Sequence, residues 1–281
     1  MTTNLTTSEL LSAGTAQLAA ASDSAHLDAE VLLALALGTS RARLKSHPEG
    51  VPDAAARTRF EALIARRAAG EPVAYIVGFK DFWTLRLAVT PAVLIPRPET
   101  ELLVERALAL RPEATARVLD LGTGSGAIAL ALASERPQWH VTATDVSADA
   151  LAVARANAAS HSLSRVEFLQ GNWFEPLGGR RFDLIVSNPP YIGADESELT
   201  TAELRREPRA ALSPGVDSLE SLRAIIRAAP PHLEHGGWLL LEHGSTQAAD
   251  VARELVVRGF RHVRSQRDLA GRERMTEARW G

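Results

Sequence analysis

The first seventy residues carry apolar side chains at the spacing of an α-helix. The segment Thr6–Gly70 is rich in Ala and Leu and poor in β-branched residues, and its apolar residues recur three or four positions apart, as in Val31 and Leu35. Gly38 is placed to end the helix that contains them, and Pro52 to begin a later one at its first turn. The pattern predicts a small all-helical domain of about three to five short helices.

A change of pattern follows this segment. Aromatic and β-branched residues alternate with polar ones over Tyr75–Thr90, which is typical of a short β-hairpin. The prolines of Pro91–Pro98 resist helix and predict an ordered loop, after which a helix is expected over Glu99–Leu110. We therefore expect a helical domain over residues 1–74, a hairpin and linker over 75–98, and a second domain over 99–281.

The second domain shows strands and helices in alternation. Such a pattern predicts an α/β fold with a doubly wound parallel sheet, whose ligands lie beyond the carboxyl ends of the strands. A terminal strand pair is expected at Phe260–Ser265 and Arg274–Arg279. Strands are expected at Arg117–Leu121, His140–Thr144, Val166–Gln170, Phe182–Ser187 and Trp238–Glu242, and helices at Ala127–Ser134, Ala148–Ala159, Ser218–Ala229 and Thr246–Val257.

Composition narrows the class of protein. At 281 residues the chain can bury a core without staples, and 46% hydrophobic with 23% charged residues is typical of a folded globular protein. The net charge of −3 gives no overall attraction to nucleic acid or anionic lipid. The chain has no Cys, and no signal peptide is evident. The apolar run Val31–Leu37 is far too short to span a membrane. We expect a cytoplasmic protein that does not bind membranes.

A glycine-rich turn follows the first strand of the predicted sheet. The sequence Asp120–Gly126 reads D-L-G-T-G-S-G and directly precedes a helix. Glycines allow close approach of a ligand, and the amides of a helix N-terminus favour its polar groups. A turn that serves only strand-to-helix packing is the alternative. The spacing G-x-G-x-x-A also fits a dinucleotide site. The candidate cofactor residues here are Gly122, Thr123, Gly124, Ser125 and Gly126.

Three further residues lie where neighbouring strands are expected to end. Asp145 follows the turn by about twenty residues, where a carboxylate can accept hydrogen bonds from both ribose hydroxyls, although an Asp there can also cap a helix. Asn172 and Trp173 follow the third strand, where an amide and an indole face suit an adenine ring. A buried core Trp is the alternative. Together they favour an adenosine-containing ligand.

The fourth strand ends in the sequence N-P-P-Y. Its members are Asn188, Pro189, Pro190 and Tyr191. A planar NH2 group can donate one hydrogen to the Asn188 side chain and the other to the Pro189 carbonyl, while Tyr191 stacks on its plane. An Asn-Pro turn that merely ends a strand is the simpler interpretation, and the position beside a cofactor turn argues against it. We therefore predict catalytic roles for Asn188, Pro189 and Tyr191, with Asn188 also contacting the cofactor.

Together, D-L-G-T-G-S-G and N-P-P-Y resemble class I S-adenosylmethionine-dependent methyltransferases, which have a Rossmann-like sheet. Residues 95–101 (IPRPETE) and 241–244 (LEHG), with the helical N-terminal domain, are similar to the peptide chain release factor glutamine methyltransferase family over almost the whole chain. The resemblance implies transfer of a methyl group from S-adenosylmethionine, leaving S-adenosylhomocysteine, to the glutamine of the Gly-Gly-Gln motif in release factors. The helical domain would recognise that substrate. Asn172 stands where family members often carry Asp.

Competing functions make different demands on the sequence. A DNA or RNA adenine methyltransferase can use the same N-P-P-Y, but it must grip phosphate, and neither part of this chain is basic. A nicotinamide-dependent oxidoreductase leaves N-P-P-Y without a task, and a non-catalytic adaptor leaves both motifs without one. His232, His235 and His243 have no companion cluster, so no metal site is predicted. We expect a monomer.

Two features stay open at this point. The polar stretch Gly193–Ser213 fits either a lid over the substrate or a solvated loop. Arg97, Glu99 and Glu101 fit either ion pairs that order the linker or contacts with substrate.

Overall fold

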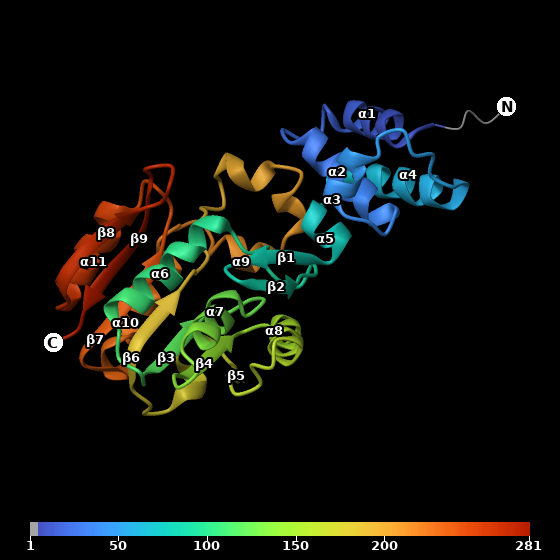
Figure 1. Ribbon diagram of the computed structural model, residues 1–281. Helices are drawn as coiled ribbons and strands as arrows, with labels where there is room; N and C mark the ends of the chain where they lie inside the picture. Colours follow the sequence, from blue (N-terminus) through green and yellow to red (C-terminus); the bar gives the residue numbers. More distant parts are fainter. Residues whose placement is uncertain (1–4) are drawn as a thin grey trace. The chain divides into compact units, whose positions relative to one another are not determined.

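The computed structural model describes residues 5–281 and divides into two compact units (Figure 1). The first contains the chain up to Gly78 together with Thr201–Arg206, and the second contains Phe79–Thr200 and Glu207–Gly281. The segment Thr201–Arg206 thus belongs to the helical unit although it lies far beyond Gly78 in the sequence.

The first unit is all-helical within the described residues. Its core contains Leu18, Leu32, Leu33, Phe60 and Ile64, each no more than 2% exposed. The helices are α1 (Thr7–Leu18), α2 (Ala25–Ala36), α3 (Arg41–Ser46), α4 (Ala54–Ala68) and α5 (Val73–Val77).

Local signals explain where several of these helices begin and end. Thr6 and Glu9 form a reciprocal capping box at the start of α1. Gly38 follows α2 with a positive φ of 60°, as its position predicted. The start of α4 differs from the prediction: Asp53 is the N-cap, accepting from the Ala56 amide at 2.6 Å, and Pro52 lies one residue before it. A capping carboxylate therefore sets this start, and the proline does not.

The second unit begins with a two-stranded hairpin, β1 (Phe79–Phe82) and β2 (Leu85–Ala88). The hairpin starts later than predicted, because Tyr75 lies in the one-turn helix α5, which Gly78 ends in the left-handed conformation at φ 82°. A 3-10 turn at Pro98–Thr100 then leads into α6 (Glu101–Leu110).

A seven-stranded sheet forms the centre of this unit, in the order β5-β4-β3-β6-β7-β9-β8 (Figure 1). The first five strands in this order are parallel, and the β7–β9 and β9–β8 pairs are antiparallel. The strands are β3 (Arg117–Leu121), β4 (His140–Asp145), β5 (Glu167–Gln170), β6 (Phe182–Ser187), β7 (Leu233–Glu242), β8 (Arg261–Arg267) and β9 (Glu273–Arg279). Successive strands are added outward on opposite sides of β3, so the order reverses between β3 and β6. This is the switch point where α/β sheets bind ligands.

Helices cover both faces of the sheet. One buried cluster includes residues of α6, α7 (Ala127–Glu135) and α8 (Ala148–Ser160), together with the hairpin. The other includes residues of α10 (Glu220–Ala228) and α11 (Ala248–Arg258). Between β6 and α10 lies the short helix α9 (Arg209–Leu212). No helix among residues 5–281 is both long enough and apolar enough to cross a membrane.

Candidate active site

The glycine-rich turn, Gly122–Gly126, joins β3 to α7. Gly122, Gly124 and Gly126 all have positive φ angles, of 70°, 57° and 86°, which glycine adopts without a steric penalty. The amides of Gly122 and Thr123 donate to the Thr144 carbonyl at 2.9 and 3.0 Å, which fixes the turn against the end of β4. The turn and the ends of two central strands are thereby held together.

Asp145 bonds both the glycine-rich turn and the start of α8. Its carboxylate accepts from the Gly124 amide at 2.9 Å and from the Ser147 amide at 2.9 Å, so it supports the glycine-rich turn and also the start of α8. Ser147 itself is the N-cap of α8, as predicted, accepting from the Ala150 amide. The Asp145 side chain remains half-buried, so it is also accessible from the edge of the sheet.

Trp173 and Asn172 lie in different environments. Trp173 has a left-handed φ of 47°, and its ring comes within 3.4 Å of the position that a Cβ would take on Gly122. The same ring packs against the second core cluster. Asn172 is exposed, and its backbone amide donates to the Glu175 carboxylate at 3.3 Å. The indole therefore borders the glycine-rich turn from the core side, whereas the Asn172 side chain faces solvent.

Asp120 was not singled out from the sequence although it begins the glycine-rich motif. It is fully buried and accepts from the Thr123 hydroxyl at 2.7 Å and from the Ala129 amide at 3.2 Å, which places it beneath the first turn of α7. Its Oδ1 has no hydrogen-bond partner within residues 5–281. Burial raises the pKa of Asp120 to about 7. The Ala129 amide at the N-terminus of α7 is therefore already hydrogen-bonded, by Asp120.

The N-P-P-Y segment follows β6 directly. The Ser187 hydroxyl donates to the Leu121 carbonyl at 2.8 Å, which ties the end of β6 to the end of β3. Asn188 is half-buried and Pro189 is buried. The Asn188 Nδ2 donates to the Thr100 hydroxyl at 3.1 Å, so Oδ1 is the end of the side chain that can accept from a ligand. The switch point thus brings N-P-P-Y and the glycine-rich turn to adjacent strands.

Tyr191 contacts a buried carboxyl group at the end of β7. Its hydroxyl donates to Glu242 Oε1 at 3.2 Å. Burial and the nearby charge of Glu242 raise the pKa of the Tyr191 phenol above its ordinary value, so the hydroxyl keeps its proton at neutral pH. Burial also raises the pKa of Glu242, to about 7. The ring of Tyr191 packs on the second core cluster while its polar end reaches Glu242.

The linker residues form bonds within the protein. Arg97 donates to Glu207 Oε1 at 2.6 Å, and the Ile95 amide donates to the other oxygen of Glu207 at 3.0 Å. Glu101 accepts from the Trp83 amide at 2.7 Å and so joins α6 to the hairpin. Arg97 thus forms one of the expected ion pairs, with Glu207, whereas Glu101 bonds a backbone amide. Glu99 is exposed.

The stretch Gly193–Ser213 is anchored at both ends. The Ile192 amide donates to the Leu212 carbonyl at 3.0 Å, and the Ala194 amide to the Gly215 carbonyl at 2.8 Å. Its middle part, Thr201–Arg206, groups with the helical unit, where Glu203 pairs with buried Arg67. The stretch therefore has its own 3-10 and α-helical turns and is not an open loop.

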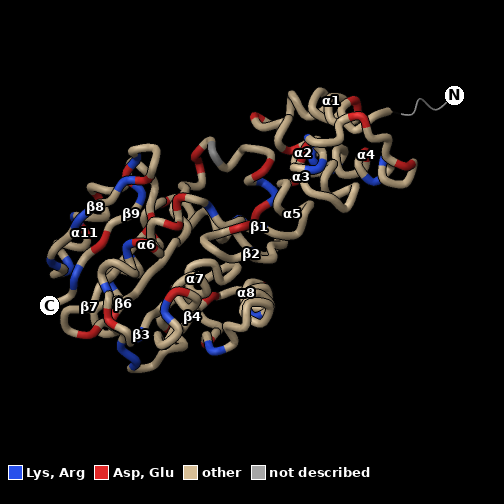
Figure 2. Tube along the Cα trace, in the orientation of Figure 1, with Lys and Arg blue, Asp and Glu red and all other residues tan. Residues whose placement is uncertain are grey.

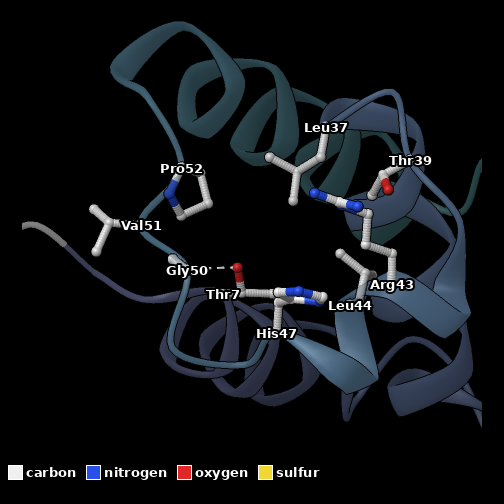
Figure 3. Close-up of a pocket in the computed structure, with 9 residues that line it drawn as sticks. All are labelled: Thr7, Leu37, Thr39, Arg43, Leu44, His47, Gly50, Val51 and Pro52. Atoms are coloured by element: carbon white, nitrogen blue, oxygen red, sulfur yellow. Dashed lines mark hydrogen bonds between the residues drawn. The ribbon is translucent and has the colours of Figure 1, made fainter.

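Two surface hollows lie away from the carboxyl ends of the strands. One, of about 300 Å³, is in the helical unit, where Figure 3 shows the Thr7 hydroxyl bonded to the Gly50 carbonyl and Arg43 and His47 on the rim. The other, of about 310 Å³, includes Arg117 and Phe182 at the amino ends of the strands.

Two of the histidines contact neighbouring side chains by ring stacking or by hydrogen bonding. His232 stacks on Phe174 with ring centroids 4.7 Å apart. His243 is buried beside Thr276, with Nε2 2.9 Å from its hydroxyl, and burial lowers the pKa of the imidazole. Within the part of the chain that is described, no three His, Cys, Asp or Glu residues are grouped so that they can hold a metal ion.

The reversed strand order with both motifs at its switch point defines a class I methyltransferase. A methyltransferase from Pyrococcus furiosus has the same fold at a TM-score of 0.52 and 20% identity, covering 70% of this chain and 89% of that one. A 16S rRNA methyltransferase of T. Thermophilus, solved with AdoMet and guanosine, matches at a TM-score of 0.55 and 20% identity, covering 72% and 50%. At such low identity these likenesses show the fold alone.

Sequence comparisons place the chain in a family. Models described as the PrmC N-terminal domain and the methyltransferase small domain match residues 9–78 and 98–217. A release factor glutamine methyltransferase from Pseudomonas aeruginosa is 53% identical over 92% of this chain and 94% of its own. One from Xylella fastidiosa is 52% identical over 94% and 97%. The chain therefore belongs to the release factor glutamine methyltransferase family.

Proposed function

We propose that this enzyme transfers the methyl group of S-adenosylmethionine to the side-chain nitrogen of the glutamine in the Gly-Gly-Gln motif of peptide chain release factors. The observation that carries the proposal is the position of N-P-P-Y. Asn188 follows β6, beside the glycine-rich turn that follows β3, and its NH2 end is held by Thr100. This leaves Asn188 Oδ1 as the end of the side chain that can accept a hydrogen from a planar NH2 group.

The residues around the glycine-rich turn fit an S-adenosylmethionine molecule. Gly122 has no side chain to obstruct a ligand, and Asp145 offers carboxylate oxygens at the end of β4. Trp173 supplies an aromatic surface next to Gly122, and Thr123, Ser125 and the exposed Asn172 supply polar groups around it. When bound, the cofactor supplies an electrophilic methyl group on a positively charged sulfur.

The protein's contribution to the reaction is placement. An amide nitrogen is a weak nucleophile because its lone pair is delocalised into the carbonyl. Asn188 Oδ1 and the Pro189 carbonyl accept the two NH2 hydrogens, which aims the lone pair and stabilises positive charge as it develops on nitrogen. Tyr191 and Pro190 hold the plane of the amide. One proton leaves the nitrogen through a backbone acceptor or water, so the mechanism includes no side-chain general base.

The helical unit is proposed to recognise the release factor. It carries its own core and its own surface hollow, so it can present a docking surface that does not depend on the sheet. Figure 2 shows basic and acidic positions interspersed in both units, which fits a protein substrate better than a phosphate backbone. The proposed substrate belongs to the translation machinery, so we place the enzyme in the cytoplasm, where it acts as a monomer.

The experiment that tests this function replaces Asn188. We expect Asn188→Ala to lower kcat for a release factor substrate by about 100- to 1000-fold, the cost of removing one oriented polar group from a transition state. Binding of S-adenosylmethionine should remain measurable by calorimetry, because the glycine-rich turn and Asp145 are unchanged and only the Asn188 contact with the cofactor is lost.

A matched control is Gln266→Ala, which removes an amide from the edge strand β8, where the Gln266 side chain donates to Glu277. This variant should keep the wild-type kcat. The proposed role of Asn188 is wrong if Asn188→Ala methylates the release factor at the wild-type rate. The proposed substrate is wrong if the wild-type enzyme binds the cofactor and leaves every release factor unmethylated.

A further inference from the structure

The motif LEHG, at residues 241–244, has no task in the mechanism above. It ends β7 and leads into α11 through a tight turn. The Gly244 amide donates to Gln247 Oε1 at 2.8 Å, and the Gln247 amide donates back to the Gly244 carbonyl at 3.0 Å. Two bonds between the same pair of residues therefore close the turn that follows β7.

The Gln247 side chain also reaches N-P-P-Y. Its Nε2 donates to the Tyr191 carbonyl at 3.0 Å, across 56 positions of the sequence. Gln247 is only 8% exposed, so water has little access to this bond. The Tyr191 hydroxyl donates to Glu242 Oε1 at 3.2 Å. Tyr191 is therefore held at both of its polar ends by residues at the end of β7 and in the turn that follows it.

The orientation of the Gln247 amide is fixed by partners that can each play only one role. The Gly244 N–H can only donate, so it bonds Oε1, and the Tyr191 carbonyl can only accept, so it bonds the NH2 end. His243 supports the turn from the core, with Nδ1 2.9 Å from the Gly244 carbonyl and Nε2 2.9 Å from the Thr276 hydroxyl. A half-turn of the Gln247 amide would lose both of its bonds.

Two successive prolines limit how the N-P-P-Y backbone can be fixed. Neither proline has an N–H, so neither can donate to a neighbouring strand. The chain is instead fixed on both sides of the prolines. Before them the Ser187 hydroxyl ties β6 to β3, and after them the Ile192 amide donates to the Leu212 carbonyl at 3.0 Å. The bond from Gln247 acts between these two points, on the Tyr191 carbonyl.

Helix capping does not explain a glutamine at this position. Gln247 is the N-cap of α11, and its side chain forms no capping bond there. Ser, Thr, Asp and Asn are the residues that cap helices well, because their short side chains reach the first free amides. The longer side chain of Gln247 instead bridges Gly244 and Tyr191. A residue that served only the stability of α11 would be shorter.

We propose that Gln247 is a positioning residue for methyl transfer, which holds Tyr191 so that its ring lies against the plane of the substrate amide. The inference rests on the proposed function, because it assigns a role within that reaction. Gln247 contacts the Tyr191 backbone and does not itself touch the reacting atoms. Displacement of the ring would let the amide tilt, and the nitrogen lone pair would lose its alignment with the methyl group.

The main test compares the full-length wild type with Gln247→Glu, using a purified release factor and labelled S-adenosylmethionine. The carboxylate keeps an acceptor for the Gly244 amide but turns a second acceptor toward the Tyr191 carbonyl, so the bond to N-P-P-Y is replaced by repulsion. We expect kcat to fall by about 10- to 100-fold, as when a group at the reaction centre is misplaced by about 1 Å. The KM for the release factor should change less, because the helical unit is unaltered.

Trp139→Phe is the matched control. Trp139 is also buried, and its indole N–H donates to the backbone carbonyl of Glu113 at 3.0 Å. This variant therefore also removes one side-chain donor from a backbone carbonyl, away from both motifs. It should lower the melting temperature and leave kcat unchanged. Equal losses of kcat in the two variants would show that Gln247 contributes stability alone.

A double-mutant cycle tests whether Gln247 acts through Tyr191. In Tyr191→Leu the ring is absent, so its placement no longer affects the reaction. Adding Gln247→Glu to that variant should then cause little further loss of methyl transfer, measured with enzyme in excess over long incubations. The same fold-loss from Gln247→Glu in both backgrounds would contradict the proposed role.

Gly244→Ala covers the case in which Gln247→Glu does not fold. A Cβ on Gly244 would lie 3.2 Å from Gln247 Oε1, so the added methyl group crowds that amide while the side chains around Tyr191 are retained. We expect a smaller fall in kcat. An active wild type with an unaltered kcat in Gln247→Glu, or in Gly244→Ala where the former does not fold, overturns this inference alone. A wild type that never methylates the release factor overturns the proposed function instead.

Discussion

Asn157 connects three segments of the second unit, called the catalytic unit below because it contains the candidate active site. It lies in α8, is 1% exposed, and accepts from the Ala88 amide at 2.7 Å. Its Nδ2 donates to the Ala88 carbonyl at 3.0 Å and to the Ser125 carbonyl at 2.9 Å. Asn157→Ala removes all three bonds and leaves the end of β2 and the glycine-rich turn without these partners.

The expected loss can be worked out from these bonds. Each intramolecular hydrogen bond contributes about 0.5–1.5 kcal/mol net, and a buried group left unpaired costs about 1–3 kcal/mol. Two Ala88 groups and one Ser125 carbonyl lose their partners, and water reaches part of the partly buried hairpin end. We therefore expect Asn157→Ala to lower the free energy of unfolding by about 2–5 kcal/mol.

Tryptophan fluorescence during urea unfolding is a suitable assay. All five tryptophans, at positions 83, 139, 173, 238 and 280, lie in the catalytic unit, so the signal reports on that unit alone. The same variant should weaken S-adenosylmethionine binding, because Ser125 belongs to the glycine-rich turn. Ser160→Ala, which removes one hydroxyl bond to the Asn157 carbonyl in the same helix, is the control and should cost less than about 1.5 kcal/mol. A loss below about 0.5 kcal/mol with unchanged cofactor affinity would refute the reasoning.

Two further predictions concern buried charges. In the helical unit, Arg67 is 2% exposed and pairs with Asp28 at 2.7 Å and with Glu203. Arg67→Met should therefore lower the stability of that unit by about 3–5 kcal/mol. Far-UV circular dichroism during urea unfolding measures this loss, and an unchanged unfolding midpoint would contradict the prediction. In the catalytic unit, the pKa of Asp120 is raised from 3.8 to about 7, so its contribution to stability is present at low pH and is lost as the pH rises toward 7. Asp120→Asn should remove that part of the decline, and parallel stability curves for variant and wild type between pH 5 and 8 would show that the carboxyl does not titrate there.

The sequence predicted the sheet well because its strands carry strong local signals. Phe182–Ser187 is a buried apolar run, and the structure forms β6 over the same residues. The strand β7 begins five residues before the predicted Trp238, because a register shift beside Phe182 lets Leu233 join the sheet. Bulges of this kind depend on the neighbouring strand, so a single segment cannot reveal them.

The hairpin boundary was missed for a different reason. Val73–Val77 is rich in β-branched and aromatic residues, which indicates a strand, yet it forms the helix α5 between Pro72 and left-handed Gly78. Burial of Tyr75 and Ile76 in the structure outweighs their weak helix propensity. Tertiary packing therefore determines that this segment is helical, and the local sequence alone does not reveal that packing.

The candidate site was only partly accessible to sequence reasoning. The glycine-rich turn and N-P-P-Y are contiguous motifs, so their residues could be named directly. Thr100 stands 88 positions before Asn188, which donates to its hydroxyl. Glu242 stands 51 positions after Tyr191, from which it accepts a hydrogen bond. Such contacts depend on the order of strands in the sheet. The signal for Glu242 was its place at the end of a buried strand, which the sequence alone did not distinguish from a core position.

Transfer of labelled methyl from S-adenosylmethionine to a purified release factor tests the proposed function most directly. The parallel acceptors are the same factor with Gln→Ala in its Gly-Gly-Gln motif and duplex DNA. We predict label on the unaltered factor alone. Label on the Gln→Ala factor or on DNA would contradict the proposed substrate.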